Sequence, residues 1–207
     1  MTRILVIEAS PNGETSVSRA LTKQFIDNWR QKEPAVQVIW RDVGRTPPPH
    51  LDQKTINAYY TAPEARTADQ QLILDLSDRI VDEVEAADVV VIGSPMHNFG
   101  ISSGLKTWLD HLARVGRTFR YTENGPEGLL GGRKVFVLTA RGGSYAAGTP
   151  TAAMDLQEPY LRTVLGFIGI TDVTCIHAEG TAGGDTGKEK AMAEIMKTAD
   201  AAAKIAA

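Results

Sequence analysis

Hydroxyl side chains gather in one short stretch near the start of the chain, Glu8–Ser18, which we call the first loop. Ser10, Thr15, Ser16 and Ser18 lie within a span of nine residues. An apolar run precedes this stretch and an apolar repeat follows it, so the loop is expected to connect a strand to a helix. The O–H groups, together with backbone N–H groups at the helix start, are donors for a phosphate. The pattern favours a phosphate site over a simple helix cap.

A turn that mixes polar and apolar side chains follows the β-branched run Val89–Ile92. This second loop (Gly93–Gly100) contains Met96-His97-Asn98-Phe99. Its backbone and the Asn98 amide are suited to the polar edge of a flat heterocycle. Met96 and Phe99 supply apolar contact with the faces of such a ring or with a neighbouring subunit. His97 alone is a weak signal, because a single histidine is more often a surface residue than a catalyst.

A pair of glycines marks the third loop, Thr139–Tyr145, which includes Ala140-Arg141-Gly142-Gly143. Glycines allow the backbone to approach a ligand closely, and they also simply end strands. On these residues alone the two interpretations remain open.

Strand-like and helix-like patterns alternate along the whole chain, which is typical of βαβ units on a parallel sheet. The sequence predicts an α/β, flavodoxin-like, doubly wound five-stranded parallel sheet of order 2-1-3-4-5 with helices on both faces. In that order the first, third and fourth strands adjoin, so their carboxyl ends bring the three loops together. The expected strands are Arg3–Ile7, Val36–Arg41, Val89–Gly93, Lys134–Thr139 and Val173–His177.

Helical repeats of apolar residues fill the gaps between the expected strands, as in the stripe Val17, Leu21, Phe25 and Trp29. Two long segments interrupt the alternation of strands and helices. We call them the first excursion, Arg45–Arg66, and the second excursion, Gly116–Gly132. Because both contain aromatic side chains among polar ones, we expect a lid or a subunit interface rather than disorder.

Composition excludes several classes of function. The net charge is −3, with 22 basic and 25 acidic residues scattered along 207 positions, so nucleic acid is not an expected partner. Cys175 is the only cysteine and lies in an apolar run, where a core role is expected. No segment reaches the roughly 18 uninterrupted apolar residues of a membrane span. With no basic leader or cleavage site at the start, we expect a soluble cytoplasmic protein without a membrane partner.

Other chemistries lack their motifs. The patterns GxxxxGK[ST], GxGxxG after the first strand and HExxH are all absent. The histidines are spread out, so no metal site is expected; they are His50, His97, His111 and His177.

In combination, these segments resemble the FMN-dependent NADH-azoreductase / NADH:quinone oxidoreductase family of bacteria, and the resemblance covers essentially the whole chain. The segments that carry it are Ser10 with Ser16-Val17-Ser18, Met96-His97-Asn98-Phe99, Ala140-Arg141-Gly142-Gly143, Phe119–Gly128 and Gly166–Ile170. The chain departs from the family pattern at His97, where Tyr is familiar, and at Ala140, where Ser is common. Contacts between the backbone and a cofactor would survive both changes.

The resemblance implies one flavodoxin-like FMN-binding domain over residues 1–207, in a homodimer with one FMN per subunit near the interface. It implies two-electron transfer from NADH or NADPH through FMN to quinones or azo compounds, by a ping-pong course. Ser10 and Ser16-Val17-Ser18 would hold the phosphate, Met96-His97-Asn98-Phe99 would contact the ring and ribityl chain, and Ala140-Arg141-Gly142-Gly143 would contact the polar edge of the ring. No catalytic side chain is assigned, because the flavin carries the chemistry.

A flavodoxin-type electron carrier without its own NADH turnover is the alternative. The mild net charge argues against it, since docking carriers tend to be strongly acidic, and the two excursions offer material for a substrate pocket.

Overall fold

The computed structural model describes residues 1–184 and 186–206, and its centre is a parallel sheet of five strands in the order β2-β1-β3-β6-β7. Counting only these strands, the order is 2-1-3-4-5, which confirms the predicted topology. The strands are β1 (Arg3–Glu8), β2 (Gln37–Asp42), β3 (Val89–Pro95), β6 (Lys134–Ala140) and β7 (Asp172–Ala178).

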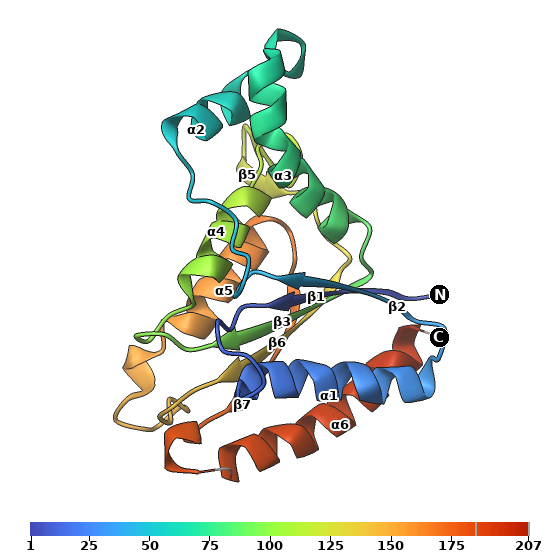
Figure 1. Cartoon of the computed structure of the whole chain (residues 1–207), viewed down its shortest axis with the longest axis vertical. Coiled ribbons are helices and arrows are strands. Elements are labelled where there is room, and N and C mark those ends of the chain that lie inside the picture. Colours follow the sequence, from blue (N-terminus) through green and yellow to red (C-terminus); the bar gives the residue numbers. More distant parts are fainter. Residues whose placement is uncertain (185, 207) are drawn as a thin grey trace.

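Helices cover both faces of the sheet, so its inner strands are buried on two sides (Figure 1). On one face, α1 (Val17–Lys32) and α6 (Thr186–Ala206) lie side by side over a core that contains Phe25, Trp29 and Phe136. The other face carries α3 (Ala68–Glu85), α4 (Ser103–Leu112) and α5 (Gln157–Phe167). Short 3₁₀ helices lie between these elements, and they are η1 (Pro63–Ala65), η2 (Ala152–Met154) and η3 (Thr181–Gly183).

The first excursion, Arg45–Arg66, is not an irregular loop throughout, because it contains the helix α2 (Gln53–Tyr60). Tyr59 of α2 is 8% exposed, and its hydroxyl lies 3.0 Å from His111 Nδ1. The other ring nitrogen of His111 lies 3.0 Å from the Pro49 carbonyl, and burial lowers the pKa of this imidazole. These contacts attach the proline-rich stretch and α2 to α4.

The second excursion, Gly116–Gly132, contains an antiparallel hairpin of β4 (Phe119–Thr122) and β5 (Gly125–Gly128). Phe119, an aromatic residue of this excursion, is buried and does not face solvent. Its side chain is 7% exposed and packs on Phe167 with ring centroids 4.6 Å apart. Tyr121, in contrast, is 67% exposed.

Strand register places the carboxyl ends of β1, β3 and β6 next to one another. Glu8 pairs with Gly93, and Pro95 pairs with Ala140. Two backbone hydrogen bonds continue this alignment beyond the strands, from Ala9 N to the Gly93 carbonyl at 2.9 Å and from Met96 N to the Ala140 carbonyl at 2.8 Å. The three loops are therefore neighbours at one edge of the sheet.

Within the part of the chain that the structure describes, no helix combines the length and the apolar character that crossing a membrane requires.

Candidate functional site

The first loop ends in the N-terminus of α1, where hydroxyl groups are concentrated. Ser16 caps the helix by accepting a hydrogen bond from Arg19 N at 3.3 Å, and its Oγ lies 3.2 Å from Ser18 Oγ. As first-turn amides, the N–H groups of Val17 and Ser18 have no partner within the helix. No acidic side chain lies in the first turn of α1. The positive end of the helix dipole is thus uncompensated, which suits an anion.

Arg19 fixes the shape of this loop. Its guanidinium donates to the carbonyls of Ser10 at 2.6 Å and Asn12 at 2.8 Å, and it pairs with Asp42 at 2.7 Å. The hydrogen bond with Asp42 is the main cause of a raised pKa at Arg19. Arg19 could not be identified from the sequence, because an arginine on a helix gives no sign of which loop carbonyls it contacts.

Gly44, two residues after the end of β2, also contacts the loop. A Cβ built at this position would lie 2.1 Å from the Ser10 carbonyl oxygen, so any larger residue would displace the backbone of Ser10. The close approach of the two chain segments fixes the backbone of Ser10, whose buried hydroxyl accepts a hydrogen bond from Asn12 N at 3.3 Å.

Glu8, at the end of β1, is a buried carboxyl group behind the first loop. It is 4% exposed, and its Oε1 accepts a hydrogen bond from Thr22 Oγ1 at 2.5 Å. Its Oε2 has no hydrogen-bond partner among the described residues. Burial is the largest influence on this group and raises its pKa.

Glu8 predicts a measurable pH dependence of stability. Because its pKa in the folded state lies above that of the unfolded chain, its contribution is complete below pH 4.5 and is lost as the pH rises through the folded-state pKa. The Tm of the wild type should therefore rise relative to that of Glu8→Gln as the pH falls from neutral toward 5. Each kcal/mol corresponds to roughly 2–4 °C in a domain of this size. Parallel Tm profiles for the two proteins would contradict a buried, protonatable Glu8.

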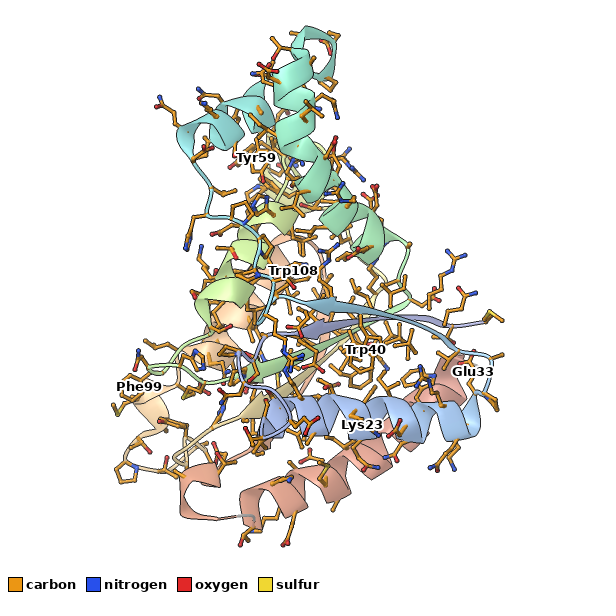
Figure 2. All side chains as sticks on the ribbon, viewed as in Figure 1. Lys23, Glu33, Trp40, Tyr59, Phe99 and Trp108 are labelled. Carbon is orange, nitrogen blue, oxygen red and sulfur yellow. The ribbon has the colours of Figure 1, made fainter. Side chains whose placement is uncertain are left out.

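The second loop closes in a tight turn with unusual backbone angles. His97 and Gly100 exchange two hydrogen bonds, with N–O distances of 2.9 and 3.0 Å. The residues between them, Asn98 and Phe99, have φ angles of 47° and 71°, the geometry of a type I′ turn. A bulky aromatic residue is rare at positive φ, and such strain is concentrated at functional sites. Phe99 lies at the outer edge of the molecule and is 39% exposed (Figure 2).

The third loop separates an inward-facing side chain from outward-facing glycines. Arg141 is 1% exposed and points into the protein, whereas Gly142 and Gly143 are exposed. A Cβ at Gly142 would meet only the Ala182 methyl group at 3.6 Å, and one at Gly143 only the Tyr145 ring at 3.4 Å. Neither glycine has a positive φ. The fold itself therefore does not require glycine at these two positions.

A cavity of about 980 Å³ lies beside β7, between the segment 144–152, α5 and α6. Of the residues predicted to bind the cofactor, only Arg141 lines it. Cys175 also lines it and packs against the core, as expected, and burial raises the pKa of its thiol to about 12. A thiol with such a pKa is almost entirely protonated at neutral pH and is a poor nucleophile.

Comparison with known proteins matches residues 2–203 to a family described as having a flavodoxin-like fold. An FMN-dependent NADH:quinone oxidoreductase of Herminiimonas arsenicoxydans is 50% identical over 198 residues, covering 96% of this chain and 97% of that relative. The chain belongs to the FMN-dependent NADH:quinone oxidoreductase family. A second member, from Pseudomonas aeruginosa, is 51% identical over 95% of this chain and 91% of its own length. The family predicted from the sequence is thus confirmed.

A solved structure of an azoreductase has the same fold as this member of the oxidoreductase family. The FMN-dependent NADH-azoreductase from Bacillus anthracis, crystallised in complex with FMN, is 28% identical and has a TM-score of 0.89. The alignment covers 98% of this chain and all of the azoreductase chain.

Proposed function

We propose that this protein is an FMN-dependent oxidoreductase that transfers two electrons from NADH to a quinone. The observation that carries the proposal is the meeting of the three loops at one sheet edge, in a chain that is 50% identical to an FMN-dependent NADH:quinone oxidoreductase. Residues 1–207 would act as one FMN-binding domain.

The first loop fits the phosphate group of FMN. The hydroxyls of Ser10, Ser16 and Ser18 and the first-turn amides of Val17 and Ser18 are donors, which the phosphate oxygens need as acceptors. Burial raises the pKa of the Glu8 carboxyl group, which lies behind this loop.

The second and third loops fit the two ends of a flavin ring. Met96, Asn98 and the turn backbone would contact the ring and the ribityl chain, with His97 and Phe99 in the same turn. Gly142 and Gly143, next to Ala140 and Arg141, are exposed and carry no Cβ, so backbone N–H groups there could approach the polar edge of the ring.

When bound, FMN supplies hydride acceptance and two-electron transfer, and the protein supplies binding and orientation. The net reaction is NADH, a proton and a quinone giving NAD⁺ and a hydroquinone. We propose a ping-pong course in which nicotinamide and quinone occupy the same face in turn. We propose further that aromatic azo compounds can replace the quinone as electron acceptor and that NADPH can replace NADH as electron donor.

A homodimer would complete the site. The parts of the second and third loops that would face the flavin are exposed in one chain, including His97, Asn98, Phe99 and Gly142. A ring bound there would be covered on one side only, and Tyr121 of the second excursion is a further exposed aromatic side chain. We propose a cytoplasmic homodimer with one FMN per subunit close to the interface. Sedimentation as a monomer at micromolar concentration would contradict the shared pocket.

Steady-state kinetics test the proposed enzyme against a flavodoxin-type carrier. The FMN-loaded protein should oxidise NADH with a simple benzoquinone when no other reductase is added. Parallel assays with NADPH and with an azo dye test the wider donor and acceptor range. NADH oxidation only after addition of a separate reductase would favour the electron carrier.

A further inference from the structure

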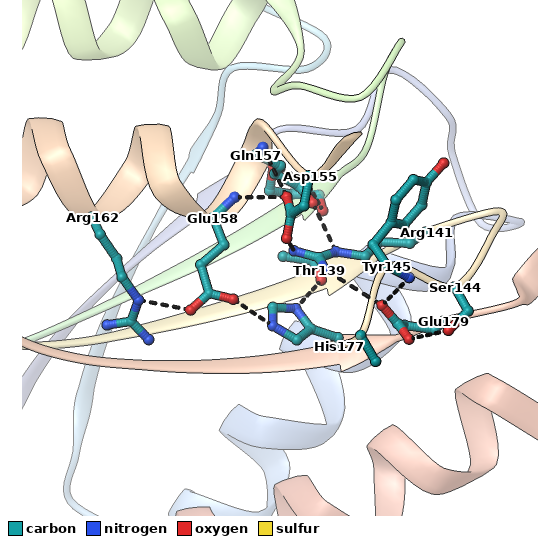
Figure 3. Close-up of polar contacts among 12 residues, drawn as sticks. Thr139, Arg141, Ser144, Tyr145, Asp155, Gln157, Glu158, Arg162, His177 and Glu179 are labelled. Atoms are coloured by element: carbon teal, nitrogen blue, oxygen red, sulfur yellow. Dashed lines mark hydrogen bonds and ion pairs between the residues drawn. The ribbon is translucent and has the colours of Figure 1, made fainter. Parts of the chain in front are cut away.

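Arg141 lies in the third loop but directs its charged group away from the proposed flavin face. Its guanidinium contacts three side chains inside the protein (Figure 3). It pairs with Asp155 at 3.0 Å and with Glu179 at 3.4 Å, and it donates to Gln157 Oε1 at 3.2 Å. The backbone of Arg141 is also engaged, since its N–H donates to the Ala178 carbonyl at 2.8 Å. Arg141 is therefore not free to bind a cofactor with its side chain.

Gln157 connects Arg141 to the end of β3. Its Nε2 donates to the carbonyl of Ser94 at 3.2 Å and lies 3.1 Å from Ser94 Oγ. Both Gln157 and Ser94 are completely buried. Since Ser94 belongs to the second loop, one buried side chain spans the distance between the second and third loops.

Glu179, just after β7, holds the other end of the third loop. One of its carboxylate oxygens accepts from Tyr145 N at 2.8 Å, and the other accepts from Ser144 Oγ at 2.7 Å. The Tyr145 ring in turn meets the Phe99 ring edge-on, with centroids 6.4 Å apart. The segment that follows the two glycines is thus fixed against the tip of the second loop.

Asp155 caps the start of α5 and completes the connection. Its Oδ1 accepts from Gln157 N at 2.9 Å and Glu158 N at 3.2 Å. Between these residues, Leu156 N donates to the carbonyl of Phe99 at 3.0 Å. Phe99 is one of the two residues held at positive φ, so the α5 start supports the strained turn.

A buried charge with two carboxylate partners is costly to desolvate and is stable only when the whole set of contacts is formed. Stability alone does not explain the arrangement, because an apolar cluster of similar volume often serves as well. Together, these contacts fix the position of the second loop relative to the third. They involve the side chains of Arg141, Gln157, Asp155 and Glu179.

We propose that Arg141, with Gln157, is a positioning residue that sets the spacing of the two loops on which the flavin ring would lie. The proposal rests on the proposed function for the identity of the ligand. It assigns Arg141 a role distinct from direct cofactor contact, and it adds residues at the start of α5 and just after β7 to those that support the FMN site.

The test compares Arg141→Lys and Gln157→Met with Arg114→Lys in the FMN-loaded full-length protein. Arg114 is a matched control, because its side chain is also 2% exposed and pairs with an aspartate, Asp78, at 3.0 Å. Lysine keeps the charge but cannot reproduce the planar fork of arginine, and methionine removes the amide of Gln157 at similar size. The readouts are the rate of FMN release after dilution, the visible flavin spectrum and Tm.

We expect Arg141→Lys and Gln157→Met to speed FMN release about tenfold, with altered flavin absorption bands. Arg114→Lys should lower Tm without changing either flavin readout. FMN release at the wild-type rate in both site variants, or equal acceleration in Arg114→Lys, would overturn the positioning role.

Hydrogen exchange in the FMN-free full-length protein gives a second readout that does not depend on flavin. The amides of Met96, His97 and Gly100 are hydrogen-bonded, so their exchange reports on the loop geometry. They should exchange faster in Arg141→Lys than in Arg114→Lys, and equal protection would refute the proposal. A wild-type protein that takes up no FMN would instead refute the proposed function, whatever the exchange data show.

Discussion

Replacing Ser16 and Ser18 together by alanine is expected to raise the dissociation constant for FMN about 100-fold, because in the proposed site each hydroxyl would donate to a charged phosphate oxygen. Their oxygens lie 3.2 Å apart at the start of α1, which places both within reach of one phosphate group. Fluorescence titration of FMN into the FMN-free variant measures the effect. An affinity equal to that of the wild type would refute the phosphate assignment.

Loss of the Ser16 helix cap also destabilises α1 by about 1 kcal/mol, so the titration needs a control for capping. Thr67 caps α3 in the same way, accepting from Gln70 N at 3.2 Å within a capping box. Thr67→Ala should lower Tm by a similar amount and leave FMN affinity unchanged. A drop in affinity in Thr67→Ala would show that general destabilisation, rather than loss of phosphate donors, weakens binding.

The double change Gly142→Ala, Gly143→Ala is expected to weaken FMN binding at least about tenfold without lowering Tm. The folded chain has space for both methyl groups, and neither glycine needs a positive φ. Alanine also restricts the unfolded chain, which stabilises a compatible site by about 0.4–1 kcal/mol. Only a ligand that lies against the backbone would be displaced. Titration calorimetry with FMN and thermal unfolding of the same samples measure the two quantities.

Gly166→Ala is the matched control for this pair. Gly166 lies in α5, and a Cβ there would meet no atom within 4 Å. It should raise Tm and leave FMN binding unaltered, since alanine favours the helix by about 0.5–1 kcal/mol over glycine. If the double variant binds FMN as the wild type does, the paired glycines merely end the strand, the interpretation that the sequence left open.

The parallel sheet could be predicted from the sequence because its strands are apolar on both faces and are bounded by turn residues. The run Val89–Ile92 with Gly93 after it is an example, and it became β3 (Val89–Pro95). The same reasoning failed for the two excursions. In α2 the buried residues are Thr55, Ala58 and Tyr59, which do not form an aliphatic stripe, while Ile56 is 43% exposed. The hairpin strand Gly125–Gly128 contains no β-branched residue at all.

The location of the candidate site followed from topology, since loops after adjoining parallel strands must meet. The buried polar contacts that support the site could not be predicted from the topology. Arg141 contacts Asp155, Gln157 and Glu179, which lie 14 to 38 positions away in the sequence and belong to two different segments, the start of α5 and the end of β7. Periodicity describes which face of an element is buried, but it does not say which polar groups meet beneath it.

One anaerobic titration tests the central claim most directly, namely that the three loops hold an FMN that NADH reduces. The purified protein should be yellow or take up FMN to one molecule per chain, and the flavin colour should bleach in proportion to added NADH. A protein that remains colourless with excess FMN would contradict the cofactor site. Bound FMN that dithionite bleaches and NADH does not would contradict the enzyme and favour an electron carrier.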